Sequence, residues 1–179
     1  MTAQAKIAIV TGAAQGIGRR TAEVLAAKDY ALILNDLQSC AEVVSAFQRV
    51  GRQAVEVRGD VSDEGVAQAI AQAARSLFGR VDVLVNNAAI AHICPAEKIS
   101  TAEWRRVQDV NLLGPFLLSR EVGVMMLEQR LGSIINIASI AGLLAIADRA
   151  AYNASKHGLI GLTRTLAAEW GGRGVRSTG

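Results

Sequence analysis

The stretch Thr11-Gly12-Ala13-Ala14-Gln15-Gly16-Ile17-Gly18 decides the fold. It comes after a short apolar run, Ile7 to Val10, and opens a segment of helical period. Gly12 permits a tight turn there, while Gly16 and Gly18 lack side chains, so the backbone can approach a pyrophosphate at the helix N-terminus. Because glycines also serve ordinary turns, the dinucleotide-binding interpretation depends on residues further along the chain.

Short apolar runs alternate with longer segments of helical period along the chain. The runs at Ile7, Ala31, Val83 and Ile134 are apolar on successive residues, which favours strands covered by helices on both faces. Right-handed helical crossovers then predict an α/β fold with a Rossmann-type doubly wound parallel sheet. Strands are expected at Ile7 to Val10, Ala31 to Leu34, Gln53 to Val57, Val81 to Val85 and Ser133 to Ile137, and helices at about Gly16 to Lys28, Ser39 to Val50, Asp63 to Phe78, Thr101 to Gln129 and Arg149 to Trp170. Gly79 and Gly132 are expected to be the left-handed residues that end helices.

The composition indicates a single domain over residues 1–179, with 51% apolar residues and no Pro/Ser-rich boundary. The net charge of +3 comes from scattered Lys and Arg, so no nucleic-acid partner is expected. Cys40 and Cys94 lack CxxC spacing, which favours a reduced compartment. The start lacks a signal peptide, and no stretch approaches the roughly 18 apolar residues of a membrane span. We therefore expect a cytoplasmic protein without a membrane segment.

Asp36 lies directly after the second predicted strand, roughly twenty residues after the glycine turn. Dinucleotide folds place an acid at this distance, where it binds the hydroxyls of the adenosine ribose. The carboxylate would repel a 2′-phosphate, so it favours NAD over NADP. The alternative is a solvated acid at a strand end.

Four polar residues, Asn111, Ser139, Tyr152 and Lys156, stand at the ends of apolar segments or on one helix face. Tyr152 and Lys156 are one helical turn apart, so their side chains lie on the same face. A nearby lysine cation would help a tyrosine exchange protons at neutral pH, and Ser139 could hydrogen-bond a substrate oxygen. Taken one at a time, an exposed Tyr–Lys pair, a helix cap at Ser139 and a turn residue at Asn111 are the alternatives. His92 and His157 are unpaired and lack ligand spacing, and no metal site is expected.

The motifs together resemble those of the short-chain dehydrogenase/reductase family. The resemblance lies in the glycine turn, the run Asn86-Asn87-Ala88-Ala89, Ser139 and the run Tyr152-Asn153-Ala154-Ser155-Lys156, and it extends to about Arg176. Ala89 departs from it, since the family most often has glycine there.

The resemblance implies hydride transfer between NAD(H) and the carbinol or carbonyl carbon of a secondary alcohol or ketone, including 3-oxoacyl-type substrates. It implies a catalytic tetrad of Asn111, Ser139, Tyr152 and Lys156, with Asn111 holding a water that links Lys156 to solvent. NADP-preferring relatives frequently carry Arg or Lys at the position of Gln15, so Gln15, like Asp36, favours NAD. By the same resemblance, Asp60 and Val61 would flank the adenine, and Asn87 would lie along the adenosine side. Lys156 would also hold the nicotinamide ribose. The expected cofactor-binding residues are Gly12, Gln15, Gly16, Ile17, Gly18, Asp36, Asp60, Val61, Asn87, Tyr152 and Lys156.

The resemblance also bears on the C-terminal end. Family members usually continue through a sixth and a seventh strand, whereas Ser177-Thr178-Gly179 lacks the apolar pattern of a strand. We therefore expect a domain that lacks the last two strands and is incomplete at its C-terminus. This leaves two hypotheses: an active NAD-dependent dehydrogenase, or a truncated, catalytically impaired fragment that at most binds NAD or a partner subunit. A homodimer through the helices at 101–129 and 149–170 is implied by the family.

Overall fold

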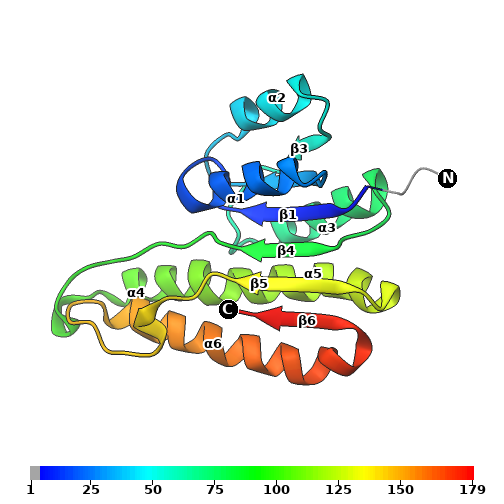
Figure 1. Cartoon of the computed structure of the whole chain (residues 1–179). Helices are drawn as coiled ribbons and strands as arrows, with labels where there is room; N and C mark the ends of the chain where they lie inside the picture. The colour runs from blue at the N-terminus through cyan, green and yellow to red at the C-terminus, as the bar shows by residue number, and fades with distance from the viewer. Residues whose placement is uncertain (1–4) are drawn as a thin grey trace.

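A computed structural model describes residues 5–179, which fold into one parallel sheet with helices on both faces (Figure 1). The sheet order is β3-β2-β1-β4-β5-β6. This is the Rossmann order, in which the direction of winding reverses between β1 and β4. The strands are β1 Ile7–Thr11, β2 Ala31–Asn35, β3 Ala54–Glu56, β4 Val83–Asn86, β5 Gly132–Asn136 and β6 Val175–Thr178. The α-helices are α1 Gly16–Ala27, α2 Ala41–Arg49, α3 Glu64–Leu77, α4 Thr101–Gln108, α5 Gly114–Gln129 and α6 Ala150–Trp170.

The fold prediction is confirmed, and β1 and β2 are buried at every position, on both faces of the sheet. Ile9 of β1 belongs to a core cluster with residues of α3 and α5. Its neighbours Ala8 and Val10 point the other way, into a second cluster with α1 and α2. Successive side chains of a strand alternate between faces, so a run that is apolar at every position requires helices on both sides.

The expectation that the last two strands are missing is wrong for the sixth strand. Val175–Thr178 pairs in parallel with β5, from Gly132↔Val175 to Ile135↔Thr178, so β5 is not a sheet edge. Strand pairing uses backbone groups, which Ser177 and Thr178 supply as well as apolar residues do. Gly174 turns the chain into β6 at φ +89°, where a side chain would clash with the Arg130 carbonyl.

The predicted end of the helix before β5 also needs correction. Gly79 has the expected left-handed φ of 70°, but Gly132 belongs to β5, and Arg130 ends α5 with φ 53°. Gly132 is required by packing instead, since a Cβ there would lie 2.5 Å from the Met126 sulfur.

The predicted helix from Thr101 to Gln129 is continuous but contains a π-helical turn, Asp109–Leu113, between α4 and α5. The 29-residue helix has the length and hydropathy of a membrane span, although 61% of its most apolar window is buried inside the fold. The expectation that no stretch approaches these properties is therefore too strict. Burial of this kind is what a core helix shows.

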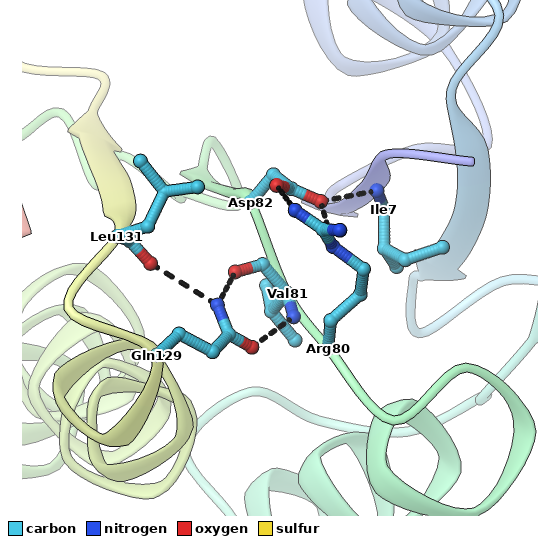
Figure 2. A network of polar contacts seen from close by, with 6 residues as sticks. All are labelled: Ile7, Arg80, Val81, Asp82, Gln129 and Leu131. Carbon is cyan, nitrogen blue, oxygen red and sulfur yellow. Dashed lines mark hydrogen bonds and ion pairs between the residues drawn. The ribbon is translucent and has the colours of Figure 1, made fainter. Parts of the chain in front are cut away.

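Two polar side chains, Asp82 and Gln129, form hydrogen bonds at the end of the sheet where the parallel strands begin (Figure 2). Asp82 accepts a hydrogen bond from the Ile7 amide at 2.8 Å and pairs with Arg80. Gln129, at the end of α5, bonds to both the amide and the carbonyl of Val81, at 2.9 and 2.7 Å. These contacts tie β1, β4 and α5 together at the end of the sheet where the strands begin.

Candidate active site

The glycine turn after β1 has the geometry of an anion-binding loop. Gly12 and Gly16 have φ of +64° and +57°, which favour glycine. A Cβ on Gly18 would clash with the Gly12 carbonyl oxygen, whereas one on Gly16 would meet nothing within 4 Å. Gln15 precedes α1 without a side-chain cap, so the first amides of the helix are free to bind an anion.

Asn87, which directly follows the neighbouring strand β4, forms hydrogen bonds with the backbone of this turn. Its side-chain amide donates to the carbonyls of Thr11 and Gly12 at 2.9 and 3.2 Å. The Thr11 hydroxyl in return accepts the amides of Asn87 and Ala88, both at 3.0 Å. The turn is therefore held in place at the point between β1 and β4 where the winding reverses.

Asp36 is oriented by two backbone amides. One carboxylate oxygen accepts from Ala14 at 3.0 Å and the other from Gln38 at 2.9 Å. The first bond brings the acid directly against the glycine turn. The half-buried carboxylate borders the cleft at the carboxyl edge of the sheet.

This cleft has a volume of about 270 Å³ and opens beside the glycine turn. Six of the predicted cofactor residues line it, namely Gly12, Gln15, Asp36, Asp60, Val61 and Asn87. Gly16 and Ile17 lie exposed on the first turn of α1, Gly18 is buried beneath it, and Tyr152 and Lys156 lie on α6. The open space at Gly16, the uncapped helix and the acid at Asp36 fit the phosphates and ribose of a dinucleotide.

Tyr152 and Lys156 share one face of α6, as their spacing predicted. The Lys156 ammonium donates to the Ile137 carbonyl at 2.6 Å and lies 5.7 Å from the centre of the Tyr152 ring. Lys156 is only 2% exposed, and this burial lowers its pKa to about 8. The Lys156 ammonium is therefore a buried cation beside the half-buried Tyr152 ring.

Asn111 lies in the π-helical turn, a type of irregularity that is frequent at functional sites. Its amide pairs with both backbone groups of Ile90, at 2.9 and 2.8 Å, and donates to the Ser155 hydroxyl at 3.1 Å. Ser155 in turn donates to the Tyr152 carbonyl at 2.7 Å. Both amide hydrogens of Asn111 are therefore used, and this side chain joins the segment after β4 to the helix that carries Tyr152. The sequence assigned no role to Ser155 or Ile90, because their partners are distant in the chain.

Ser139 starts the 3₁₀ turn Ile140–Gly142, and its hydroxyl accepts the Ala141 amide at 3.1 Å. The capping alternative is thus the observed geometry, and the hydroxyl hydrogen is still available to a ligand. A Cβ on Gly142 would lie 2.9 Å from the Lys156 carbonyl, so this turn packs directly on α6. Ser139 lines a largely apolar cavity of about 740 Å³, together with Ile140, Leu143 and Ile160.

The histidines differ from expectation in one respect. His92 is not unpaired, because its Nε2 lies 3.3 Å from a carboxylate oxygen of Glu103 on α4. His157 contacts the Asn153 carbonyl one helical turn earlier. Within residues 5–179, His, Cys, Asp and Glu side chains form no group of three that could hold a metal ion.

The winding order, the glycine turn and the Tyr–Lys pair place the chain in the class of Rossmann-type nucleotide-binding oxidoreductases. A family model described as short chain dehydrogenase matches residues 6–179, and the chain belongs to this family.

Two relatives and one solved structure show how far the similarity extends. The chain is 44% identical to D-threitol dehydrogenase of Mycolicibacterium smegmatis, over 96% of this chain and 66% of that protein. It is 39% identical to 3-oxoacyl-[acyl-carrier-protein] reductase of Synechocystis, over 96% of this chain and 70% of that protein. The crystal structure of gox2181 is similar with a TM-score of 0.92 and 36% identity, covering 97% of this chain and 70% of that one. The chain thus spans about two thirds of the length of these relatives.

The lowered pKa of Lys156 predicts a pH dependence of stability. Between pH 8 and 10.5 the unfolded chain binds more protons at this lysine than the folded chain does, so its contribution to the free energy of unfolding rises with pH. Relative to Lys156→Met, wild type should gain at most about 3 kcal/mol across this window. Urea unfolding at several pH values measures the difference. Lys98→Met, at an exposed position, controls for loss of a surface lysine, and a flat difference for Lys156→Met would contradict the prediction.

Proposed function

We propose that this chain transfers a hydride between NAD(H) and the carbinol or carbonyl carbon of a secondary alcohol or ketone, 3-oxoacyl-type substrates included. The observation that carries the proposal is the buried Lys156 ammonium beside the Tyr152 ring, at the sheet edge where the glycine turn opens its cleft. The names of the relatives, a threitol dehydrogenase and a 3-oxoacyl reductase, are consistent with alcohol and ketone chemistry.

The side chains on α6 and after β5 have separate roles in this proposal. Tyr152 gives a proton to the substrate oxygen during reduction and takes it back during oxidation. Lys156 favours negative charge on the Tyr152 oxygen and holds the nicotinamide ribose. Ser139 donates a hydrogen bond to the same substrate oxygen. Bound NAD(H) supplies or accepts the hydride.

In this proposal Asn111 is a positioning residue. It also holds the water that, by the family resemblance, links Lys156 to solvent in a proton relay. Its side chain holds Ile90 and Ser155 through three hydrogen bonds, so it fixes the distance between the cleft and α6. Since both amide hydrogens are engaged, a relay water would have to bind Asn111 through an oxygen atom.

The cleft residues divide between phosphate and adenosine. The free amides at Gly16, Ile17 and Gly18 face the pyrophosphate, with Gly12 and Gln15 beside them. Asp36 accepts from the ribose hydroxyls, and Asp60, Val61 and Asn87 surround the adenosine side. The charge of Asp36 is the basis for proposing NAD over NADP.

Tyr152→Phe should lower kcat by at least about a hundredfold, since general acid–base groups contribute roughly 10²- to 10⁴-fold. The Kd for NADH should stay within about twofold, because the ring and its contact with Lys156 are kept. Turnover of simple ketones and calorimetric NADH titration measure the two quantities. Tyr30→Phe is a matched control, because Tyr30 also lies under a lysine, Lys6, at 5.9 Å. Wild type that binds NADH without turning over any alcohol or ketone would contradict the proposed activity.

Asp36→Asn should raise the affinity for NADPH relative to NADH by roughly tenfold, because it removes the charge facing a 2′-phosphate and keeps an oxygen for the Ala14 amide. The ratio of the two dissociation constants is the measurement. Glu42→Gln removes one negative charge on the exposed start of α2 and should leave the ratio unchanged. A wild type that binds NADPH more tightly than NADH would rule out the role given to Asp36.

The exposed apolar residues of the long helices support a homodimer through α4–α5 and α6. Leu113 and Phe116 are about two fifths exposed and border a hollow of about 350 Å³ that Leu162 of α6 also lines. Light scattering should give about twice the mass of one chain. A monomer at micromolar concentration would contradict this interface.

We also propose a cytoplasmic location. The free thiols Cys40 and Cys94 suit a reducing compartment, and burial raises the pKa of the Cys40 thiol to about 11, which keeps it unreactive. Recovery of the protein from a membrane fraction would contradict this location.

A further inference from the structure

Two large apolar side chains stand exposed on the turn that follows Ser139. Ile140 is 63% exposed and Leu143 is 66% exposed, and both line the 740 Å³ cavity that Ser139 also lines. Burial of such side chains is favourable, so their exposure in the wall of a cavity indicates a surface that a ligand covers. A substrate whose oxygen meets Ser139 would bring its carbon substituents into this cavity.

The segment that carries these side chains is held on both sides. Nδ2 of Asn153, on the first turn of α6, donates to the Ile146 carbonyl at 2.8 Å. The Cys94 amide, from the loop after β4, donates to the Asp148 carbonyl at 2.9 Å. Together with the packing of the 3₁₀ turn on α6, these bonds give Leu143 a defined position beside the cavity.

The other walls of the cavity are largely apolar as well. Ile160 of α6 and Ile135 of β5 belong to them. Asn136 and Thr163 also line the cavity, but Asn136 donates to the Thr163 hydroxyl at 2.9 Å, and that hydroxyl donates to a backbone carbonyl one turn earlier on α6. A ligand with several hydroxyl groups would find few free partners here, and unpaired polar groups are costly away from water.

The polar groups that stay free lie on parts of the wall that are far from Ser139 along their strand or helix. Ser177 and Thr178 of β6 pair with residues of β5 that come four or more positions before Ser139. Arg164, the one charged side chain among the described residues that line the cavity, follows Tyr152 by twelve residues, or about 18 Å along the axis of α6. The lining residues next to Ser139 in the chain are apolar, namely Ile137, Ala138 and Ile140.

We propose that this site selects secondary alcohols and ketones that carry a large apolar group, and that Leu143 is a specificity-determining residue for that group. The inference rests on the proposed function, because it takes the reacting carbon to lie between Ser139 and Tyr152. A cavity of 740 Å³ has the size of pockets that enclose drug-sized ligands, so it accepts a substituent of many carbons. A short polyol would instead set its hydroxyl groups against apolar walls.

The test is kcat/KM for the oxidation of 2-butanol, 2-hexanol, 2-octanol and threitol with NAD. Wild type should gain roughly threefold per added methylene, since each one buries more apolar surface. Threitol should react at least about tenfold less efficiently than 2-hexanol, because its extra hydroxyls lose their water. In Leu143→Asn the gain per methylene should fall below about twofold, because the apolar wall is replaced by a polar amide of similar size.

Leu144→Asn is the matched control. Leu144 is the next residue, is 58% exposed and is not among the described residues that line the cavity, so this variant should keep the wild-type gain per methylene. A Leu143→Asn variant that lowers kcat/KM for all three monoalcohols by the same factor would overturn the inference, since a general loosening of the turn predicts that result.

A second variant covers the case in which Leu143→Asn does not fold by circular dichroism. Leu143→Phe fills part of the cavity, so it should lower kcat/KM for 2-octanol more than for 2-butanol, and an unchanged ratio would count against the inference. Wild type that oxidises threitol as efficiently as 2-hexanol would also overturn it. Wild type that turns over none of these alcohols would contradict the proposed function itself, and the inference would fall with it.

Discussion

Gly18 packs so closely under the turn after β1 that any side chain there would strike the Gly12 carbonyl oxygen. The side-chain amide of Asn87 occupies the space beside both glycines, within 2.7 Å of where their Cβ atoms would stand. One contact point thus joins β1, α1 and the end of β4. It brings the free amides of α1 to the place where the sheet reverses its winding, which is where open α/β sheets bind ligands. The Asp36 carboxylate borders the same cleft and accepts the Ala14 amide of this turn.

The Tyr–Lys helix is positioned by a second set of contacts, made of buried polar groups. Asn86 of β4 donates to Asn136 of β5 at 2.8 Å, and Asn136 donates to Thr163 of α6 at 2.9 Å. Unpaired polar groups are costly in an apolar interior, so such a chain of bonds permits few alternative arrangements. Lys156 lies two helical turns before Thr163 and is fixed by the same packing. The burial that lowers the pKa of Lys156 is therefore a consequence of how α6 is held on the sheet.

Local pattern predicted most elements, and the errors have physical causes. The five predicted strands and five predicted helices correspond to β1 to β5, α1 to α3, the continuous α4–α5 helix and α6. The sixth strand was missed because backbone pairing with β5 outweighs the polar composition of Ser177 and Thr178. Gly132 was misassigned because the sequence does not distinguish a glycine that ends a helix from a glycine that leaves room for a neighbouring side chain, here that of Met126. The π-helical turn at Asn111 was not predicted, because the spacing of apolar residues along the sequence does not distinguish one π-helical turn from the α-helix around it.

By itself the sequence determined the strand–turn–helix unit, the alternation of strands with helices and the Tyr152–Lys156 spacing, because these depend on glycine conformations and on periodicities within single elements. Only the tertiary structure decided that Arg106 meets Ser62 and Asp60, and that Asn111 meets Ser155. Each of the contacts Arg106–Ser62 and Asn111–Ser155 joins residues 44 positions apart. Such pairs form only when separate helices and loops are packed against one sheet edge, and no local pattern carries that information.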